Sequence, residues 1–260
     1  MSHSEIIRQL FAPVSEALID DAEIAPGHSV LDVATGSGEP ALRIAEFVGS
    51  GGEVVGVDPV ASLIETSRRV AAQRSLSNAR FETAGADRLP FPDDRFDAVV
   101  SRFGVMFFPA PVSGVREMMR VLRRGKKVAF AAWHFRENNP FHDVLARIVD
   151  SVLPPAQLPP DAPEPFRFAP AGKLKAIVAD AGAPNPVERL LRFSINVALS
   201  PEDFWDLRME MSEKLRERLA GLPPERFDDV KRRSISAFRD YSSASGLSFP
   251  AEVRLVSARK

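Results

Sequence analysis

A short apolar run followed by a glycine pair and a helical pattern is the feature that most restricts how this chain folds. Residues 29–34 read SVLDVA, a composition typical of a strand buried on both faces of a parallel sheet. Gly36 and Gly38 follow, and apolar residues recur at helical spacing after Pro40, which suits a first helical turn. The sequence therefore predicts a strand, a glycine loop and a helix in succession.

The same alternation continues through the first half of the chain. An amphipathic helix capped by Ser4 is expected before the first strand. Further strands are expected at 53–58, 80–83, 96–101 and 127–133, and helices at 62–74 and 112–122. Strands that alternate with helices form a parallel sheet and place ligands at the carboxyl ends of the strands. We predict an α/β fold with a doubly wound, mostly parallel sheet.

The composition changes after residue 133. Seven prolines lie between 154 and 170, too many for an ordinary helix or a central strand. A helix at 174–181, strands at 187–197 and 251–258, and two helices at 200–221 and 224–241 are expected beyond them. We predict a single domain over 1–260, with a cofactor-binding core at 1–133 and lid or cap insertions for substrate at 134–170 and 200–246.

An acidic residue, Asp58, ends the second expected strand, 20 residues past Gly38. Glycines allow a backbone to approach a ligand closely, and a carboxylate at this distance can accept from both hydroxyls of a ribose. Ala41 stands where a dinucleotide fingerprint has its third glycine, and the fingerprint allows this replacement. The spacing alone therefore fits both a dinucleotide and a nucleoside cofactor without phosphates. Asp32, four residues before Gly36, repels a pyrophosphate and attracts an ammonium group, which favours a cationic, phosphate-free nucleoside.

Composition limits the partners. Lys and Arg number 34 against 35 Asp and Glu, so the net charge of -1 gives no general attraction to nucleic acid. The absence of Cys excludes thiolate zinc sites, disulfides and cysteine nucleophiles. No leader or membrane-spanning run is recognisable. We expect a cytoplasmic enzyme with a small-molecule substrate, no nucleic-acid partner and no membrane span, and leave a homodimer open.

Three segments together resemble one protein family. They are VLDVATGSG at 30–38, AGADRLPFPDDRFDAV at 84–99 and EMMRVLRRGK at 117–126. They resemble, in order and spacing, the motifs of class I S-adenosylmethionine-dependent methyltransferases of the ubiquinone and menaquinone biosynthesis branch. The resemblance covers 30–133 and implies a seven-stranded Rossmann-like sheet whose last strand is antiparallel, S-adenosylmethionine as cofactor, and methyl transfer to O, N or C of a small, fairly apolar metabolite.

The resemblance also implies roles for single residues. The methionine end would be held by Asp32 and by the backbone of Ala34, Thr35, Gly36 and Gly38. Asp58 would bind the ribose, and the adenine would contact Pro59, Leu63 and the Ala86 N–H. Ser101 and Arg102 would border the methyl side. Family members usually have Asp where this chain has Gly85, and Asp87 is the candidate replacement. The aromatic residues at 103–108 are expected either to pack in the core or to floor an apolar pocket.

Catalytic residues are harder to assign, because methyl transfer from a sulfonium needs alignment and not necessarily a base. His134 and His142 are the candidate bases, each with packing as the alternative, and no His, Asp and Glu cluster has the spacing of a metal site. Arg102 and Arg136 are candidates for an anionic substrate group. Two other functions stay open: a nicotinamide-dependent oxidoreductase, and a regulatory module that binds the cofactor without turnover.

Overall fold

The computed structural model describes residues 6, 9–155, 157, 159 and 161–260, so Ser4 lies outside the described residues. The chain divides into two compact units. The sheet unit comprises Ala12–His134, Asp161–Leu191 and Val253–Lys260, and the helical unit comprises Met1–Phe11, Phe135–Pro160 and Arg192–Glu252. Each unit is described below by itself.

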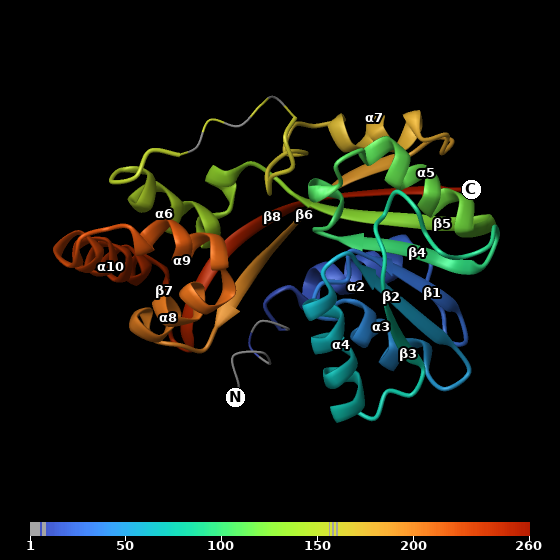
Figure 1. Ribbon diagram of the computed structural model, residues 1–260, viewed down its shortest axis with the longest axis horizontal. Helices are drawn as coiled ribbons and strands as arrows, with labels where there is room; N and C mark the ends of the chain where they lie inside the picture. The colour runs from blue at the N-terminus through green and yellow to red at the C-terminus, as the bar shows by residue number, and fades with distance from the viewer. Residues whose placement is uncertain (1–5, 7–8, 156, 158, 160) are drawn as a thin grey trace. The chain divides into compact units, whose positions relative to one another are not determined.

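The sheet unit contains the predicted alternation of strands and helices (Figure 1). Its strands are β1 (Ser29–Val33), β2 (Glu53–Asp58), β3 (Ala79–Thr83), β4 (Phe96–Arg102) and β5 (Leu122–Trp133). Its helices are α2 (Ala12–Asp21), α3 (Ala41–Val48), α4 (Ala61–Gln73), α5 (Pro111–Val121) and α7 (Lys173–Asp180), with a 3-10 turn η1 (Val105–Phe107). All five residues of β1 are buried, as its apolar sequence predicts.

The strand order confirms the predicted fold class. It runs β3-β2-β1-β4-β5-β8-β6, where β6 (Val187–Val197) and β8 (Gly246–Arg259) each have residues in both units. β1 is parallel to β2 and β4, and β5 is antiparallel to β8, as expected for the last strand. A two-residue strand, β7 (Ser242–Ser243), pairs with β8 and was not predicted.

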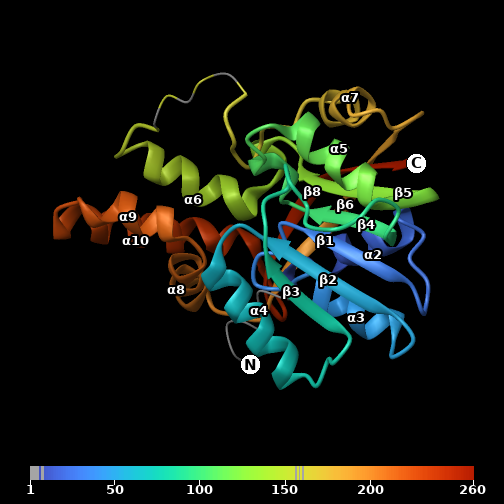
Figure 2. The same cartoon turned by 45° about the vertical axis from the view of Figure 1, so that its right-hand side comes forward.

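The order of the strands also determines where the helices lie. From β1 to β2 and β3 the chain moves one way across the sheet, and from β4 to β5 it moves the other way. Because parallel crossovers are right-handed, α3 and α4 cover one face, and α5 covers the other with α7 beside it (Figures 1 and 2). The reversal between β1 and β4 leaves a crevice at the carboxyl ends of these strands, where open α/β sheets bind ligands.

The helical unit contains α6 (Pro140–Asp150), α8 (Pro201–Met211), α9 (Glu213–Ala220) and α10 (Pro224–Phe238), with 3-10 turns η2 (Arg136–Asn138) and η3 (Arg239–Tyr241). The single helix expected over 200–221 is two helices, because Ser212 is extended (φ -133, ψ 99) and its Oγ caps α9 by accepting from the Leu215 N–H. The helix α6 was not predicted. The proline-rich stretch 154–170 has no helix or strand among its described residues.

Candidate functional site

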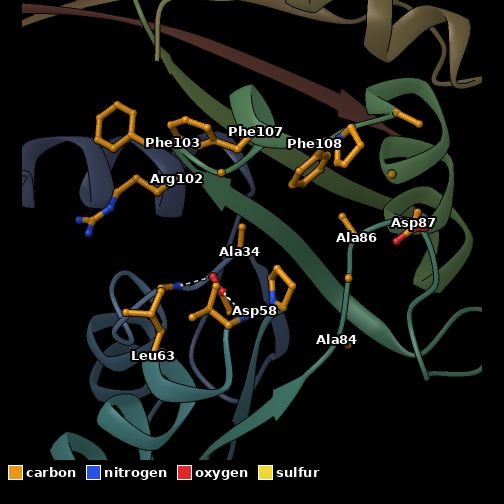
Figure 3. Close-up of a pocket in the computed structure, with 18 residues that line it drawn as sticks. Ala34, Asp58, Leu63, Ala84, Ala86, Asp87, Arg102, Phe103, Phe107 and Phe108 are labelled. Carbon is orange, nitrogen blue, oxygen red and sulfur yellow. Dashed lines mark hydrogen bonds between the residues drawn. The ribbon is translucent and has the colours of Figure 1, made fainter. Parts of the chain in front are cut away.

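A cavity of about 550 Å³ lies in the sheet unit at the carboxyl ends of β1, β2, β3 and β4 (Figure 3). The described residues that line it are Ala34, Gly36, Asp58, Pro59, Val60, Leu63, Ala84, Gly85, Ala86, Asp87, Arg102, Phe103, Gly104, Phe107, Phe108, Pro109, Ala110 and Gly114. Three of these, Val60, Leu63 and Phe107, are large apolar residues that remain exposed. Exposed apolar groups around a cavity are typical of a ligand site.

Asp58 is one of the two acidic residues that line this site. It ends β2 and is 5% exposed, and backbone groups hold its carboxylate in place. Gly36 N–H donates to Oδ2 and Val60 N–H donates to Oδ1, each at 3.0 Å (Figure 3). Each carboxylate oxygen can accept two hydrogen bonds and accepts one of these, so both oxygens keep a lone pair for a ligand. This carboxylate is thus fixed, lines the cavity, and is able to accept from two neighbouring hydroxyls.

The glycine loop after β1 has a left-handed backbone conformation at Gly36, which favours glycine. Gly36 has φ 57, and a Cβ there would meet no atom within 4 Å, so the backbone at Gly36 is open to the cavity that it lines. Gly104, which follows β4, is needed for a different reason. A Cβ on Gly104 would lie 2.4 Å from the Ala34 Cβ, so the loops after β1 and β4 approach each other only because this residue is glycine.

Asp32 lies behind the loop and does not line the cavity. It is fully buried, and its Oδ2 accepts from the Ala41 N–H at the start of α3 (3.3 Å). Its Oδ1 and the Thr35 Oγ1 are buried without a hydrogen-bond partner. Burial raises the pKa of Asp32 to about 7, against the opposing effects of Thr35 and Arg102. Gly38 and Ser101, like Asp32 and Thr35, are absent from the lining, so the roles predicted for these four residues would be indirect.

Arg102 contributes its main chain to the cavity but directs its side chain elsewhere (Figure 3). Its Nη1 donates to the Ser15 Oγ at 2.8 Å, and its Nη2 donates to the Glu39 carbonyl at 3.2 Å. Burial lowers the pKa of Arg102, and Glu39 and Asp32 oppose that shift. The guanidinium therefore ties β4 to α2 and to the segment that leads into α3. Arg136 forms ion pairs with Asp143 and Asp150.

The predicted adenine side of the site is brought together by the structure. Pro59, Leu63, Ala86 and Asp87 all line the cavity. The Asp87 Oδ1 lies 2.7 Å from the position that a Cβ on Gly85 would take. The Asp87 carboxylate therefore lies beside the position at which a side chain on residue 85 would begin.

The aromatic segment after β4 divides between the two expected roles. Phe103, Phe107 and Phe108 line the cavity (Figure 3). Met106 is buried, and its Sδ accepts from the Trp133 N–H at 3.4 Å. The Phe103 ring also stacks on the Trp133 ring, with centroids 4.3 Å apart. The segment thus supplies one wall of the cavity and anchors that wall on β5.

Neither candidate base lines the cavity. His134 follows β5 in the sheet unit, and His142 belongs to α6 in the helical unit. Burial, together with the charge of Arg208, holds the pKa of His142 well below its ordinary value. Among the described residues, no three His, Asp or Glu side chains are placed to hold a metal ion.

Sequence reasoning missed two residues that matter here. Gly104 carried a detectable signal, since it lies three residues after the strand expected at 96–101, and a glycine near a strand end favours close approach of backbones. Arg208 carried none, because nothing in the order of residues distinguishes a buried arginine on α8 from the exposed arginines around it.

Comparison with known proteins identifies the part of the chain that builds this cavity. Residues 30–125 match the family model described as a methyltransferase domain. This segment is therefore similar to the methyltransferase domains that the family model describes. An uncharacterized protein of Mycobacterium bovis is 38% identical over 125 residues, which are 48% of this chain and 44% of that protein.

Two further relatives agree with the methyltransferase domain. The ubiquinone/menaquinone biosynthesis C-methyltransferase UbiE of Shewanella sediminis is 32% identical over 133 residues, 51% of each chain. The crystal structure of YcgJ from Bacillus subtilis has the same fold, with a TM-score of 0.60, 21% identity, and coverage of 95% of this chain and 97% of that one. This chain spans about half the length of the curated relatives it matches.

In the described part of the chain, no helix is long and apolar enough to cross a membrane.

Proposed function

We propose that this protein transfers a methyl group from S-adenosylmethionine to O, N or C of a small, fairly apolar acceptor. The observation that carries the proposal is the Asp58 carboxylate, fixed by two backbone N–H groups at the edge of a cavity that the methyltransferase domain builds. When bound, S-adenosylmethionine supplies an electrophilic methyl group on a cationic sulfur. The comparisons favour neither an oxidoreductase nor a regulatory module.

The residues of the cavity suit the three parts of this cofactor. Asp58 would accept from the ribose hydroxyls with the lone pairs that Gly36 and Val60 leave available. The exposed apolar side chains of Val60 and Leu63 would pack on the adenine ring. Asp32 is buried behind the loop with a pKa raised to about 7, and a methionine ammonium bound on that side would favour its ionised form.

Alignment and exclusion of water are the catalytic contributions that these residues support. Phe103, Phe107 and Phe108 form an apolar wall along the cavity and limit the access of water to a nucleophile. We keep His134 and His142 as candidate bases for an acceptor that must lose a proton. The helical unit is proposed to bind the acceptor. The homodimer and the cytoplasmic location remain predictions.

Calorimetric titration with S-adenosylhomocysteine tests the proposal. The wild type is expected to bind at micromolar concentration, and Asp58→Ala to bind about 10 to 100 times more weakly, because charge-assisted hydrogen bonds to the ribose are lost. Glu65→Ala is the matched control, since it removes a carboxylate from the exposed face of α4 and is expected to bind as the wild type does. Equal binding by Asp58→Ala and Glu65→Ala would overturn the assignment of Asp58.

A further inference from the structure

The loop that walls one side of the cavity has few backbone hydrogen bonds of its own. It covers residues 107–111, with the sequence FFPAP, and its first four residues line the cavity. Pro109 and Pro111 have no backbone N–H to donate. The Phe108 N–H donates to the Val105 carbonyl at 3.3 Å, but no backbone donor of the described residues reaches the Phe108 carbonyl. The position of this loop therefore depends on contacts from elsewhere in the chain.

Arg167 supplies a donor to this carbonyl. Its Nη1 donates to the Phe108 oxygen at 2.7 Å, although the two residues are 59 positions apart in the sequence. Because the guanidinium is charged, this hydrogen bond is stronger than one between two neutral groups. The guanidinium carbon also lies 5.4 Å from the centroid of the Phe168 ring. Among the described residues the Arg167 side chain makes no other hydrogen bond and no ion pair, so its one polar contact is with a residue that lines the cavity.

The backbone beside Arg167 is held on the sheet by a short chain of contacts. The next two residues, Phe168 and Ala169, are 1% and 2% exposed. The Ala169 carbonyl accepts from the Nε of Arg254 on β8, and Arg254 forms an ion pair with Glu188 of β6 at 3.0 Å. All of these residues belong to the sheet unit. Arg167 therefore reaches the loop from a fixed support.

The Phe108 ring forms part of the cavity wall next to the predicted adenine side. It is 5% exposed and packs on Gly114 of α5, where a Cβ would lie 2.7 Å from a ring carbon. The same Cβ would lie 3.3 Å from the Cβ of Ala86, so Phe108 and Ala86 adjoin at this end of the cavity (Figure 3). A movement of the Phe108 backbone would carry the ring with it and change the width of the cavity beside Ala86.

We propose that Arg167 is a positioning residue for cofactor binding, which acts by holding the Phe108 ring at the adenine side of the cavity. Arg167 is absent from the lining, so its effect on binding passes through Phe108. A wall that is fixed in advance binds more tightly, because less freedom is lost when the ligand arrives. The inference rests on the proposed function, since it takes the ligand of this cavity to be S-adenosylmethionine.

Calorimetric titration with S-adenosylhomocysteine tests this role. Arg167→Met has a side chain of similar length without a donor, and it is expected to bind about ten times more weakly because the charge-assisted hydrogen bond is lost. Arg167→Lys keeps a charged donor and is expected to recover most of the affinity. Arg167→Met should weaken binding of 5′-methylthioadenosine, which has the adenine but no amino-acid portion, by the same factor. Arg124→Met removes an exposed arginine near the start of β5 and is the control, expected to bind as the wild type does.

The NMR signals of Gly114 give a readout that a loss of stability alone would not change. Because the Phe108 ring packs on Gly114, its ring current should displace the signals of the Gly114 α-protons in the wild type. In Arg167→Met these signals should move toward ordinary values, and in Arg167→Lys and Arg124→Met they should stay in place. If Arg167→Met does not fold, Arg167→Gln, which is polar but uncharged, replaces it in both measurements.

A double-mutant cycle tests whether Arg167 acts through Phe108. Phe108→Ala should weaken binding of S-adenosylhomocysteine, and adding Arg167→Met should weaken it no further. Additive effects of the two substitutions, or unchanged Gly114 signals in Arg167→Met, would overturn the proposal. Equal binding by the wild type and Arg167→Met would refute the role of Arg167 alone, whereas a wild type that does not bind S-adenosylhomocysteine would refute the methyltransferase proposal and this role together.

Discussion

Replacing Asp32 with asparagine is expected to stabilise the protein, and to do so increasingly as the pH rises from 4 to 7. Asp32 is fully buried, one of its oxygens has no hydrogen-bond partner, and burial raises its pKa to about 7 from an ordinary value of 3.8. Between these two values the folded protein keeps the proton and the unfolded chain has released it. The native state therefore loses stability through Asp32 with each step up in pH, until both states are ionised near pH 7.

The magnitude follows from the size of the pKa shift. One unit corresponds to about 1.36 kcal/mol, so a shift of this size removes on the order of 2 to 4 kcal/mol by pH 7. The asparagine side chain of Asp32→Asn cannot ionise, and its amide oxygen can still accept from the Ala41 N–H. The free energy of unfolding of Asp32→Asn, minus that of the wild type, should rise from near zero at pH 4 to a plateau above pH 7.

Urea unfolding followed by circular dichroism between pH 3 and pH 8 measures this difference. Asp97→Asn is a control of opposite sign. Burial raises the pKa of Asp97, but the Ser29 N–H and Arg123 outweigh that effect and lower it, so this carboxylate stabilises the native state above pH 4. Asp97→Asn should therefore lose stability at pH 7 and recover the wild-type value toward pH 3. A difference for Asp32→Asn that does not change with pH, or a loss of stability at pH 7.5, would refute the reasoning.

Two further variants test the walls of the cavity. Gly104→Ala places a Cβ 2.4 Å from the Ala34 Cβ, so it should lower the free energy of unfolding by about 1 to 3 kcal/mol and weaken binding of S-adenosylhomocysteine. The control is Gly221→Ala, whose Cβ would meet no atom within 4 Å. Equal effects of the two variants in urea unfolding would contradict the steric argument. Asp87→Ala should weaken binding of S-adenosylhomocysteine about tenfold in calorimetry. Binding of S-inosylhomocysteine, which lacks the adenine amino group, should be unchanged. Equal weakening of both ligands would show that Asp87 does not accept from that amino group.

The sheet unit could be predicted from the sequence because its signals are local. The buried run of β1, the two glycines after it and the acidic end of β2 each depend on a few neighbouring residues. The parallel order of the strands then follows from general rules of handedness and alternation. For the same reason the residues expected to surround the adenine, Pro59, Leu63, Ala86 and Asp87, line one cavity.

The directions in which candidate side chains point depend on contacts between distant residues, which the sequence does not show. Whether Arg102 faces a ligand or the Ser15 hydroxyl is decided by the packing of α2, 87 residues away in the chain. Asp32 and Ser101 belong to the expected motif, but the geometry of the strand ends places both behind the lining. That no ion pair of Arg208 is found among the described residues, whereas Asp143 and Asp150 of α6 pair with other arginines, is visible only in the folded chain.

The central claim is that S-adenosylmethionine binds in the cavity beside Asp58, and the amide signals of the glycines test it most directly. Gly36, Gly85, Gly104 and Gly114 line the cavity, whereas Gly172 and Gly221 do not. In transverse-relaxation-optimised spectra of the deuterated protein, titration with S-adenosylhomocysteine is expected to shift the signals of the four lining glycines and leave those of Gly172 and Gly221 in place. Saturable binding without shifts at Gly36 and Gly85, or no binding at all, would contradict the account.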